Sequence, residues 1–212
     1  MDITIRNETE RDFRQVEELT REAFWNLYFP GCVEHYLVHK MRNHPDFIGE
    51  LDAVAEVNGK IVGNIMYTKA WLTDENHQAI EIVSFGPLSV LPERQRKGIG
   101  SALIRHTINI AIKNGIPGIV IFGDPHNYCK HGFKNGKDFD ISDMNGEFPY
   151  GLLVMELKEK AFGGHLWKFR YSDVFNVNEE EAEIFDRDFP QKEKGHQYSQ
   201  DIFSIAFRSY VK

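Results

Sequence analysis

Three cations and two glycines stand together near the middle of the chain. Arg94, Arg96 and Lys97 directly precede Gly98 and Gly100. Because glycine has no Cβ, the backbone there can adopt dihedral angles that other residues avoid, and a ligand can approach it closely. An amphipathic helix begins just after this turn, and its free N–H groups and dipole favour an anion. The pattern predicts a site for a phosphate or a diphosphate.

The elements around this turn are predicted from the spacing of apolar residues. Alternation or continuous apolar runs predict strands at residues 2–6, 47–57, 61–72, 79–90, 118–123, 152–157 and 167–171. Helical spacing predicts helices at residues 10–25, 33–42, 102–114 and 179–186. Residues 202–211 fit a helix or a strand, and a helix is favoured. Gly86-Pro87 is unsuited to a regular ladder and predicts a bulge or splay in its strand.

Composition narrows the class of protein. The 212 residues are 42% hydrophobic and have a formal net charge of −7, which argues for a folded protein and against a nucleic-acid partner. The two cysteines, Cys32 and Cys129, are far apart and fit a reducing compartment. The first residues lack the apolar run of a signal peptide, and we find no stretch long enough to span a membrane. We therefore expect a cytoplasmic protein without a membrane partner.

Two common nucleotide motifs do not fit the turn. A P-loop requires G-x-x-x-x-G-K-[ST], and no such string occurs. A dinucleotide fingerprint requires a third glycine where this chain has Leu103, and it should follow the first strand of a βαβ unit instead of three strands in hairpin order. An enzyme that binds a nicotinamide dinucleotide is therefore only a distant alternative.

Two blocks resemble the GNAT superfamily of acetyl-CoA-dependent N-acetyltransferases. The string from Gln95 to Gly100 resembles the family turn Q/R-x-x-G-x-G/A, with the apolar Val90 five residues upstream. The string from Tyr128 to Phe133 resembles the family segment Y-x-x-x-G-F. The resemblance covers about residues 2–158. It implies a mixed α/β (α+β) fold, in which helices flank a central, mostly antiparallel sheet that is splayed between its fourth and fifth strands.

The same resemblance implies a site for acetyl-CoA, with no metal. Backbone groups of the fourth strand would pair with the pantetheine arm, amides of the turn would hold the diphosphate, and the segment after the fifth strand would flank the sulfur. The implied cofactor-binding residues are Leu88, Ser89, Val90, Gln95, Arg96, Lys97, Gly98, Ile99, Gly100, Ser101, Asn127 and Tyr128.

The implied reaction is direct attack of an amine on the acetyl group in a ternary complex. The amide of Val90 is a candidate donor to the oxyanion. Tyr128 is the candidate general acid for the departing thiolate. A phenol has an ordinary pKa of about 10 and a cysteine-like thiol of about 8.5, so a hydrogen bond can replace full proton transfer.

The general base is not defined by the sequence. Glu81 lies on the predicted fourth strand and is the candidate taken here, although the family's usual strand carboxylate would fall at Ser84. The alternatives are a water chain and the side chains of Glu34, His35 and His126.

Two other chemistries are disfavoured. Cys129 adjoins Tyr128 and suggests a covalent acyl-cysteine route, but no positioned base is evident. His35 and His39 share a helix face and suggest zinc, but no third ligand is evident nearby.

We divide the chain into an acetyltransferase domain, residues 1–158, and a C-terminal extension of unassigned role, residues 159–212. The aromatic residues of the extension suggest that it packs on the domain, and Trp167, Phe169 and Tyr171 are predicted to serve a core more than a ligand platform. The expected acceptor is a primary amine of a small molecule or peptide, and a homodimer is left open. A module that senses CoA or binds a partner without turnover is the alternative function.

Overall fold

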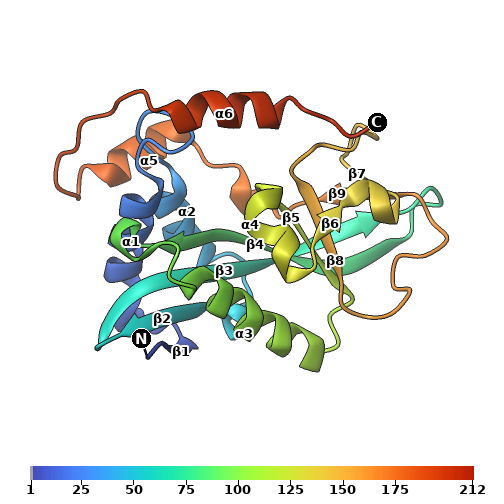
Figure 1. Cartoon of the computed structure of the whole chain (residues 1–212), viewed down its shortest axis with the longest axis horizontal. Coiled ribbons are helices and arrows are strands. Elements are labelled where there is room, and N and C mark those ends of the chain that lie inside the picture. The colour runs from blue at the N-terminus through green and yellow to red at the C-terminus, as the bar shows by residue number, and fades with distance from the viewer. Residues whose placement is uncertain (1) are drawn as a thin grey trace.

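The computed structural model describes residues 2–212, and its centre is one mixed sheet of nine strands (Figure 1). The strands run in the order β1-β2-β3-β4-β5-β8-β6, and β9 pairs with both β3 and β7. Within the described residues only the β4–β5 and β7–β9 pairs are parallel. The strands are β1 (Thr4–Asn7), β2 (Ala53–Val57), β3 (Lys60–Thr73), β4 (Ala79–Val90), β5 (Gly118–Phe122), β6 (Lys134–Asn135), β7 (Ile141–Ser142), β8 (Leu152–Glu156) and β9 (Trp167–Arg170).

Helices cover both faces of the sheet. They are α1 (Phe13–Phe24), α2 (Glu34–Met41), α3 (Ile99–Lys113), α4 (Pro125–Tyr128), α5 (Glu179–Asp186) and α6 (Tyr198–Phe207). The apolar side of α3 packs with Tyr67 and Phe85 in the largest core cluster. On the other face, α1 packs on β2 and β3, and α2 packs against Met66. The sheet is therefore buried on both sides around the predicted turn (Figure 1).

The sheet opens between β4 and β5, as the sequence predicted. Val83 and Ile119 are the one register pair between these two strands in residues 2–212. On the other edge of β4 the ladder shifts, because Gly86 and Pro87 together lie opposite Met66 of β3. The bulge expected at this Gly-Pro pair is confirmed. The residues of β4 that follow the bulge do not pair with β5 in the described structure.

One edge of β3 is shared by partners from distant parts of the chain. β2 pairs with residues 60–65, and β9 pairs with Trp71–Thr73. Between them, Ile48 donates its N–H to the carbonyl of Tyr67 at 3.0 Å, and Lys69 donates to Asp46 at 2.8 Å. The strand predicted over residues 47–57 is therefore too long. Its first part is an irregular segment that satisfies the middle of β3, and the regular strand begins at Ala53.

The C-terminal segment differs in part from its prediction. α5 has the predicted bounds, and the predicted strand at 167–171 is β9, whose Trp167 and Phe169 are buried. The final helix, α6, begins four residues before the predicted residue 202 and ends at Phe207. No element was predicted between residues 123 and 152, where the structure has α4, β6 and β7, and the two-residue length of β6 and β7 gives no periodic signal. The domain boundary near residue 158 stays a prediction.

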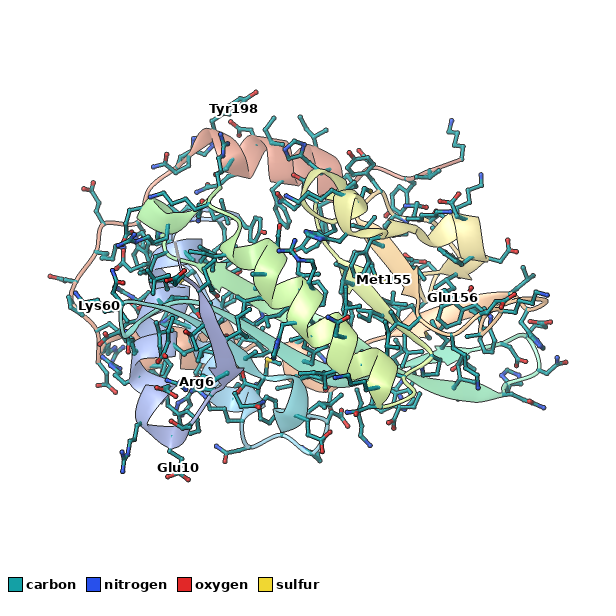
Figure 2. The ribbon with its side chains drawn as sticks, turned by 60° about the horizontal axis from the view of Figure 1, so that its bottom comes forward. Arg6, Glu10, Lys60, Met155, Glu156 and Tyr198 are labelled. Carbon is teal, nitrogen blue, oxygen red and sulfur yellow. The ribbon has the colours of Figure 1, made fainter. Side chains whose placement is uncertain are left out.

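The N-terminal strand is fixed by one arginine (Figure 2). Arg6 on β1 contacts Asp12 at 2.7 Å and Glu56 on β2 at 2.7 Å. The hydrogen bonds from the guanidinium hold the pKa of Asp12 well below its usual range. This pairing orients the start of α1 against the first two strands. In residues 2–212, no helix has the length and apolar character needed to cross a membrane.

Candidate active site

The turn before α3 presents backbone donors that the protein itself does not use. Gly98 has φ +84° and precedes the first helical residue, Ile99, whose side chain is buried in the core. The N–H of Gln95 is bonded to the carbonyl of Pro92 at 3.3 Å. The N–H groups of residues 96–101 have no acceptor within residues 2–212. Consecutive free amides at a helix start make a concave site for an anion.

The cations of the turn are also free of carboxylates. In the described residues, Arg94, Arg96 and Lys97 form no ion pair, although the chain has more acidic than basic residues. Lys97 instead bonds the backbone carbonyl of Glu93 at 2.8 Å. The side chain of Gln95 bonds the carbonyl of Val90 at 3.2 Å and thereby ties the turn to β4.

At the end of β4, the backbone groups of two residues face the splay, and those of the residue between them face β3. Leu91 donates its N–H to Val62 at 3.1 Å. Bonded and non-bonded pairs alternate in an antiparallel ladder, so the backbone groups of Leu88 and Val90 point away from β3 and into the splay. Ser89 instead faces β3, and its buried hydroxyl lies 3.0 Å from that of Thr20. An extended arm could therefore pair with Leu88 and Val90 as a strand would.

Tyr128 lies at the splay. It is the last residue of α4, and its ring packs on Phe85 at 5.6 Å and on Phe133 at 6.0 Å between centroids. Gly123 permits this position, because a Cβ there would collide with the ring. The hydroxyl of Tyr128 forms no hydrogen bond within residues 2–212, and burial raises the pKa of Tyr128 above the ordinary range. The neighbouring Asn127 is exposed, and its N–H bonds the carbonyl of Asp124.

Two carboxylates and a second phenol act electrostatically on the surroundings of Tyr128. Glu34 begins α2, and its carboxylate accepts the N–H of Val33 at 3.0 Å. Removal from water raises the pKa of Glu34 to about 7. Burial, with the charges of Glu34 and Asp124, raises the pKa of Tyr28. Tyr28 and Asp124 add to the effect of burial on the pKa of Tyr128. Tyr28 is therefore the link between Glu34 and Tyr128, and Asp124 acts on both phenols.

Two members of this group were missed by the sequence. Tyr28 lies in the α1–α2 loop, between two predicted helices, where no periodic signal marks it. Asp124 caps α4, since its carboxylate accepts the N–H of His126 at 2.9 Å. An aspartate followed by Pro125 is a recognisable helix start, so that signal was available. His126 itself is exposed.

Glu81 is located differently from Glu34. Its side chain is 54% exposed and pairs with Lys69 at 3.2 Å, near the start of β4. Ser84, where the family would have a carboxylate, lies directly opposite Thr68. Both hydroxyls are buried, and neither has a partner within residues 2–212. Water is the usual partner of such groups, so the water chain stays an alternative to a side-chain base.

His35 belongs to a separate buried network. Its Nε2 lies 3.0 Å from Asp186, at an angle too poor for a good hydrogen bond, and its Nδ1 lies 3.4 Å from the sulfur of Cys32. Arg21 binds the same aspartate at 2.6 and 3.0 Å. Burial lowers the pKa of His35 to about 4 and raises that of Cys32, so both are neutral near pH 7. The network joins α1, α2 and α5.

The two histidines considered for zinc have different neighbours. His39 lies 3.0 Å from Glu17, away from the contacts of His35 with Asp186. Two other groups bring one histidine and two carboxylates together, around His44 and around His165. They lie at loop surfaces, and their oxygens accept hydrogen bonds from the protein. Cys129 is exposed beside Tyr128, with no hydrogen-bond partner for its sulfur in residues 2–212.

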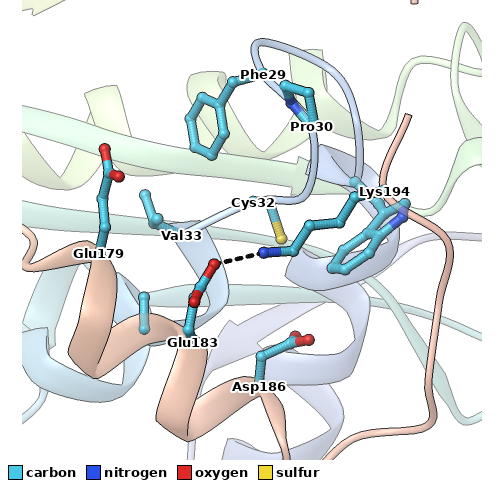
Figure 3. A pocket seen from close by; sticks show the side chains of 10 residues that line it. Phe29, Pro30, Cys32, Val33, Glu179, Glu183, Asp186 and Lys194 are labelled. Atoms are coloured by element: carbon cyan, nitrogen blue, oxygen red, sulfur yellow. Dashed lines mark hydrogen bonds and ion pairs between the residues drawn. The ribbon is translucent and has the colours of Figure 1, made fainter. Parts of the chain in front are cut away.

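Two surface hollows lie beside α5. The smaller has a volume of about 70 Å³ and is lined by Cys32, Asp186 and the Lys194–Glu183 ion pair (Figure 3). A wider, open hollow of about 600 Å³ follows the loop from Arg187 to Lys194. Ligand sites commonly have about 300–1,000 Å³ with few, convergent polar groups. The first hollow is too small for that, and the second is an open surface that mixes charged side chains with Trp25 and Phe189. We place the chemistry at the splay because the free backbone donors of the turn and Tyr128 adjoin it.

Comparisons with known proteins all find N-acetyltransferases of one family. The model of the acetyltransferase (GNAT) family matches residues 8–133. An uncharacterized N-acetyltransferase, YjhQ of Escherichia coli (strain K12), is 33% identical over 84 residues, which are 40% of this chain and 46% of that protein. The match thus spans less than half the length of this curated relative.

Solved structures share the fold. A GNAT family N-acetyltransferase, YhbS from Escherichia coli in complex with CoA, has a TM-score of 0.71 and 22% identity, over 82% of this chain and 92% of that one. A GNAT family acetyltransferase from Brucella melitensis in complex with acetyl-CoA has a TM-score of 0.63 and 24% identity, over 82% and 98%. The predicted splayed fold is confirmed. Since the family model covers more than half of the sequence, this chain belongs to the acetyltransferase (GNAT) family.

Proposed function

We propose that the protein transfers an acetyl group from acetyl-CoA to a primary amine of a small molecule or peptide. The observation that carries the proposal is the row of unused N–H groups at residues 96–101, next to unpaired cations and to the free edge of β4. Diphosphate and pantetheine are the chemical groups that such donors fit. Relatives of the same fold have been crystallised with CoA and with acetyl-CoA, which supports the assignment.

The proposed reaction is a direct attack within a ternary complex. The nitrogen of the acceptor forms a bond to the acetyl carbon, and the bond between that carbon and the sulfur of CoA breaks. The N–H of Val90, which points into the splay, stabilises the oxyanion that forms between these steps. The phenol of Tyr128 hydrogen-bonds the departing thiolate. Because burial raises the pKa of Tyr128, a hydrogen bond is easier here than full proton transfer.

For the base, we propose Glu34, one of the alternatives that the sequence left open, in place of Glu81. A catalytic base works best when its pKa lies near the working pH. The pKa of Glu34 is raised to about 7, and its charge acts on Tyr28, which in turn acts on Tyr128. Glu81 is exposed and held by Lys69. Glu34 therefore accepts the proton of the attacking amine, directly or through water.

The test measures ligand binding and turnover separately. We expect acetyl-CoA to raise the melting temperature and NAD to leave it unchanged. We expect thiol release from acetyl-CoA only when a primary amine is added, together with an acetylated product detected by mass spectrometry.

Other outcomes select other functions. Stabilisation by acetyl-CoA without product from any amine would favour the module that senses CoA without turnover. Stabilisation by NAD alone would favour a dinucleotide enzyme and reject the proposal.

A further inference from the structure

Hydrogen bonds attach the last helix, α6, to the rest of the described chain near its two ends. At its start, Gln200 donates to the carbonyl of Asn26 at 2.9 Å and Ser199 donates to Leu27 at 2.8 Å. After its end, Tyr150 donates its N–H to Ser209 at 2.8 Å and Val211 donates to Phe148 at 2.8 Å. Figure 1 shows α6 crossing the molecule between these two attachment points.

Both attachment points adjoin the acetyl-transfer site. The first is the loop that carries Tyr28 and leads to Glu34. The second leads to Gly151, whose carbonyl accepts the N–H of Gly123 at 2.9 Å, and Gly123 lies under the ring of Tyr128. The helix therefore bridges the two loops that bring the proposed base and the proposed acid together.

The two sides of α6 differ in what they meet. Phe203 stacks on Tyr28, with 4.5 Å between ring centroids, and on Phe207 at 5.7 Å. These two phenylalanines lie four residues apart and share the inner side with Gln200. Tyr198, Ile202 and Ile205 lie on the opposite side, and Figure 2 shows Tyr198 at the outer margin of the molecule.

The inner side is apolar and incompletely covered. Phe203 is 37% exposed and Phe207 is 69% exposed. Neither belongs to a core cluster of the described residues. An aromatic side chain buries a large apolar area when a ligand covers it. Phe203 and Phe207 therefore form an apolar strip next to Tyr28 that a ligand could cover.

The charges near this strip are negative. The charges of Glu34 and Asp124 act on Tyr28, and the ring of Tyr28 contacts Phe203. A protonated amine is attracted to such a site, whereas a second anionic group on the substrate would be repelled.

We propose that the inner side of α6 binds the body of the acceptor, and that the acceptor is a cationic primary amine with an aromatic body. The inference rests on the proposed acetyl transfer. The ring of the acceptor lies against Phe203 and Phe207, while its amine lies between Glu34 and the thioester. The C-terminal extension thereby selects the substrate.

The experiment compares two primary amines, 2-phenylethylamine and ethanolamine, with saturating acetyl-CoA. We expect kcat/KM to be at least about 10-fold higher for 2-phenylethylamine. Phe207→Ala should lower this preference about 5-fold, mainly through the KM of the aromatic amine, with the KM of acetyl-CoA unchanged. Phe207 contacts little besides Phe203, so the variant should fold. Ile205→Ala, on the outer side and 62% exposed, is the matched control.

The outcomes separate this inference from the proposed function. Acetylation of both amines at equal efficiency, or equal effects of Phe207→Ala and Ile205→Ala, would overturn the role of α6 but keep the acetyltransferase. Failure of every amine to become acetylated by an enzyme that binds acetyl-CoA would reject the proposed function, and this inference with it. Binding of 2-phenylethylamine to the CoA-bound protein, weakened in Phe207→Ala, provides a readout besides turnover.

Discussion

The donor side and the acceptor side of the site are built in different ways. The donor side consists of the end of β4, the turn and the start of α3, which are contiguous in sequence. Its interactions come from backbone groups, and side chains mainly shape the turn. The acceptor side is assembled from the α1–α2 loop, α4 and the tail, which are far apart in sequence.

This difference shows where variation is tolerated. A contiguous backbone site can keep one cofactor while most side chains change, because its donors do not depend on side-chain type. A site made of side chains from several segments changes its substrate whenever one segment changes. We therefore expect the donor side to define the family and the acceptor side to define the individual enzyme.

The largest expected effect is at the point where the two sides meet. Tyr128→Phe removes the hydroxyl that we propose to hydrogen-bond the departing thiolate, and it keeps the ring on Phe85 and Phe133. General acid–base groups contribute typically 10²–10⁴-fold, so kcat should fall about 10²-fold with every amine. Steady-state kinetics measure this. An unchanged kcat would remove Tyr128 from the reaction.

The second prediction tests the acceptor side by the pH dependence of kcat/KM. The folded protein retains the proton of Glu34 up to a pKa of about 7, so the base form appears above that pH and kcat/KM should rise through it. Glu34→Gln should remove this limb and lower kcat about 10²-fold at pH 8. Glu81→Gln is the matched control and should keep the profile. The opposite result would restore Glu81 as the base.

A third prediction tests whether the acceptor side depends on the tail. Asp186→Ala leaves the buried Arg21 without its partner, which should cost about 2–3 kcal/mol in the free energy of unfolding. Because α5 is then less firmly anchored to α1 and α2, the KM of the amine should rise. Acetyl-CoA should still raise the melting temperature of the variant. Denaturant unfolding and kinetics measure the two effects.

Its control lies on the same helix. Glu183→Ala breaks only an exposed ion pair with Lys194 and should leave the unfolding midpoint unchanged. Equal losses in the two variants would indicate that the buried network does not anchor the tail.

The smallest effect tests the donor side with two glycines. Gly98 has φ +84° and Gly59 has φ +73°, and a Cβ would meet open space at both. Alanine at either position should cost about 1–2 kcal/mol in stability, because the left-handed conformation disfavours a side chain. Only Gly98→Ala should also raise the KM of acetyl-CoA, about 10-fold. A similar rise in Gly59→Ala would indicate a general loss of stability.

The two sides also differ in what the sequence could predict. The turn, the splay and the bulge follow from local signals, namely Gly98, Gly100 and the Gly86-Pro87 pair, because backbone conformation is determined locally there. The proximity of Tyr28 and Glu34 to Tyr128 depends on how two distant segments pack, and no spacing in the sequence encodes it. Glu81 was chosen as the base because the sequence predicts its position on a strand. The sequence could not predict that Glu34 is removed from water, because this depends on tertiary packing.

The pairing of β9 with the far edge of β3 affects how the chain is made. The ribosome delivers Trp71–Thr73 long before Lys168–Arg170, so part of this strand stays unpaired while the intervening residues are synthesised. A nascent chain that stops before residue 167 therefore displays a bare strand edge, to which other chains can add. Monodisperse folding therefore depends on residues 168–170 being made before another chain reaches the free edge of β3.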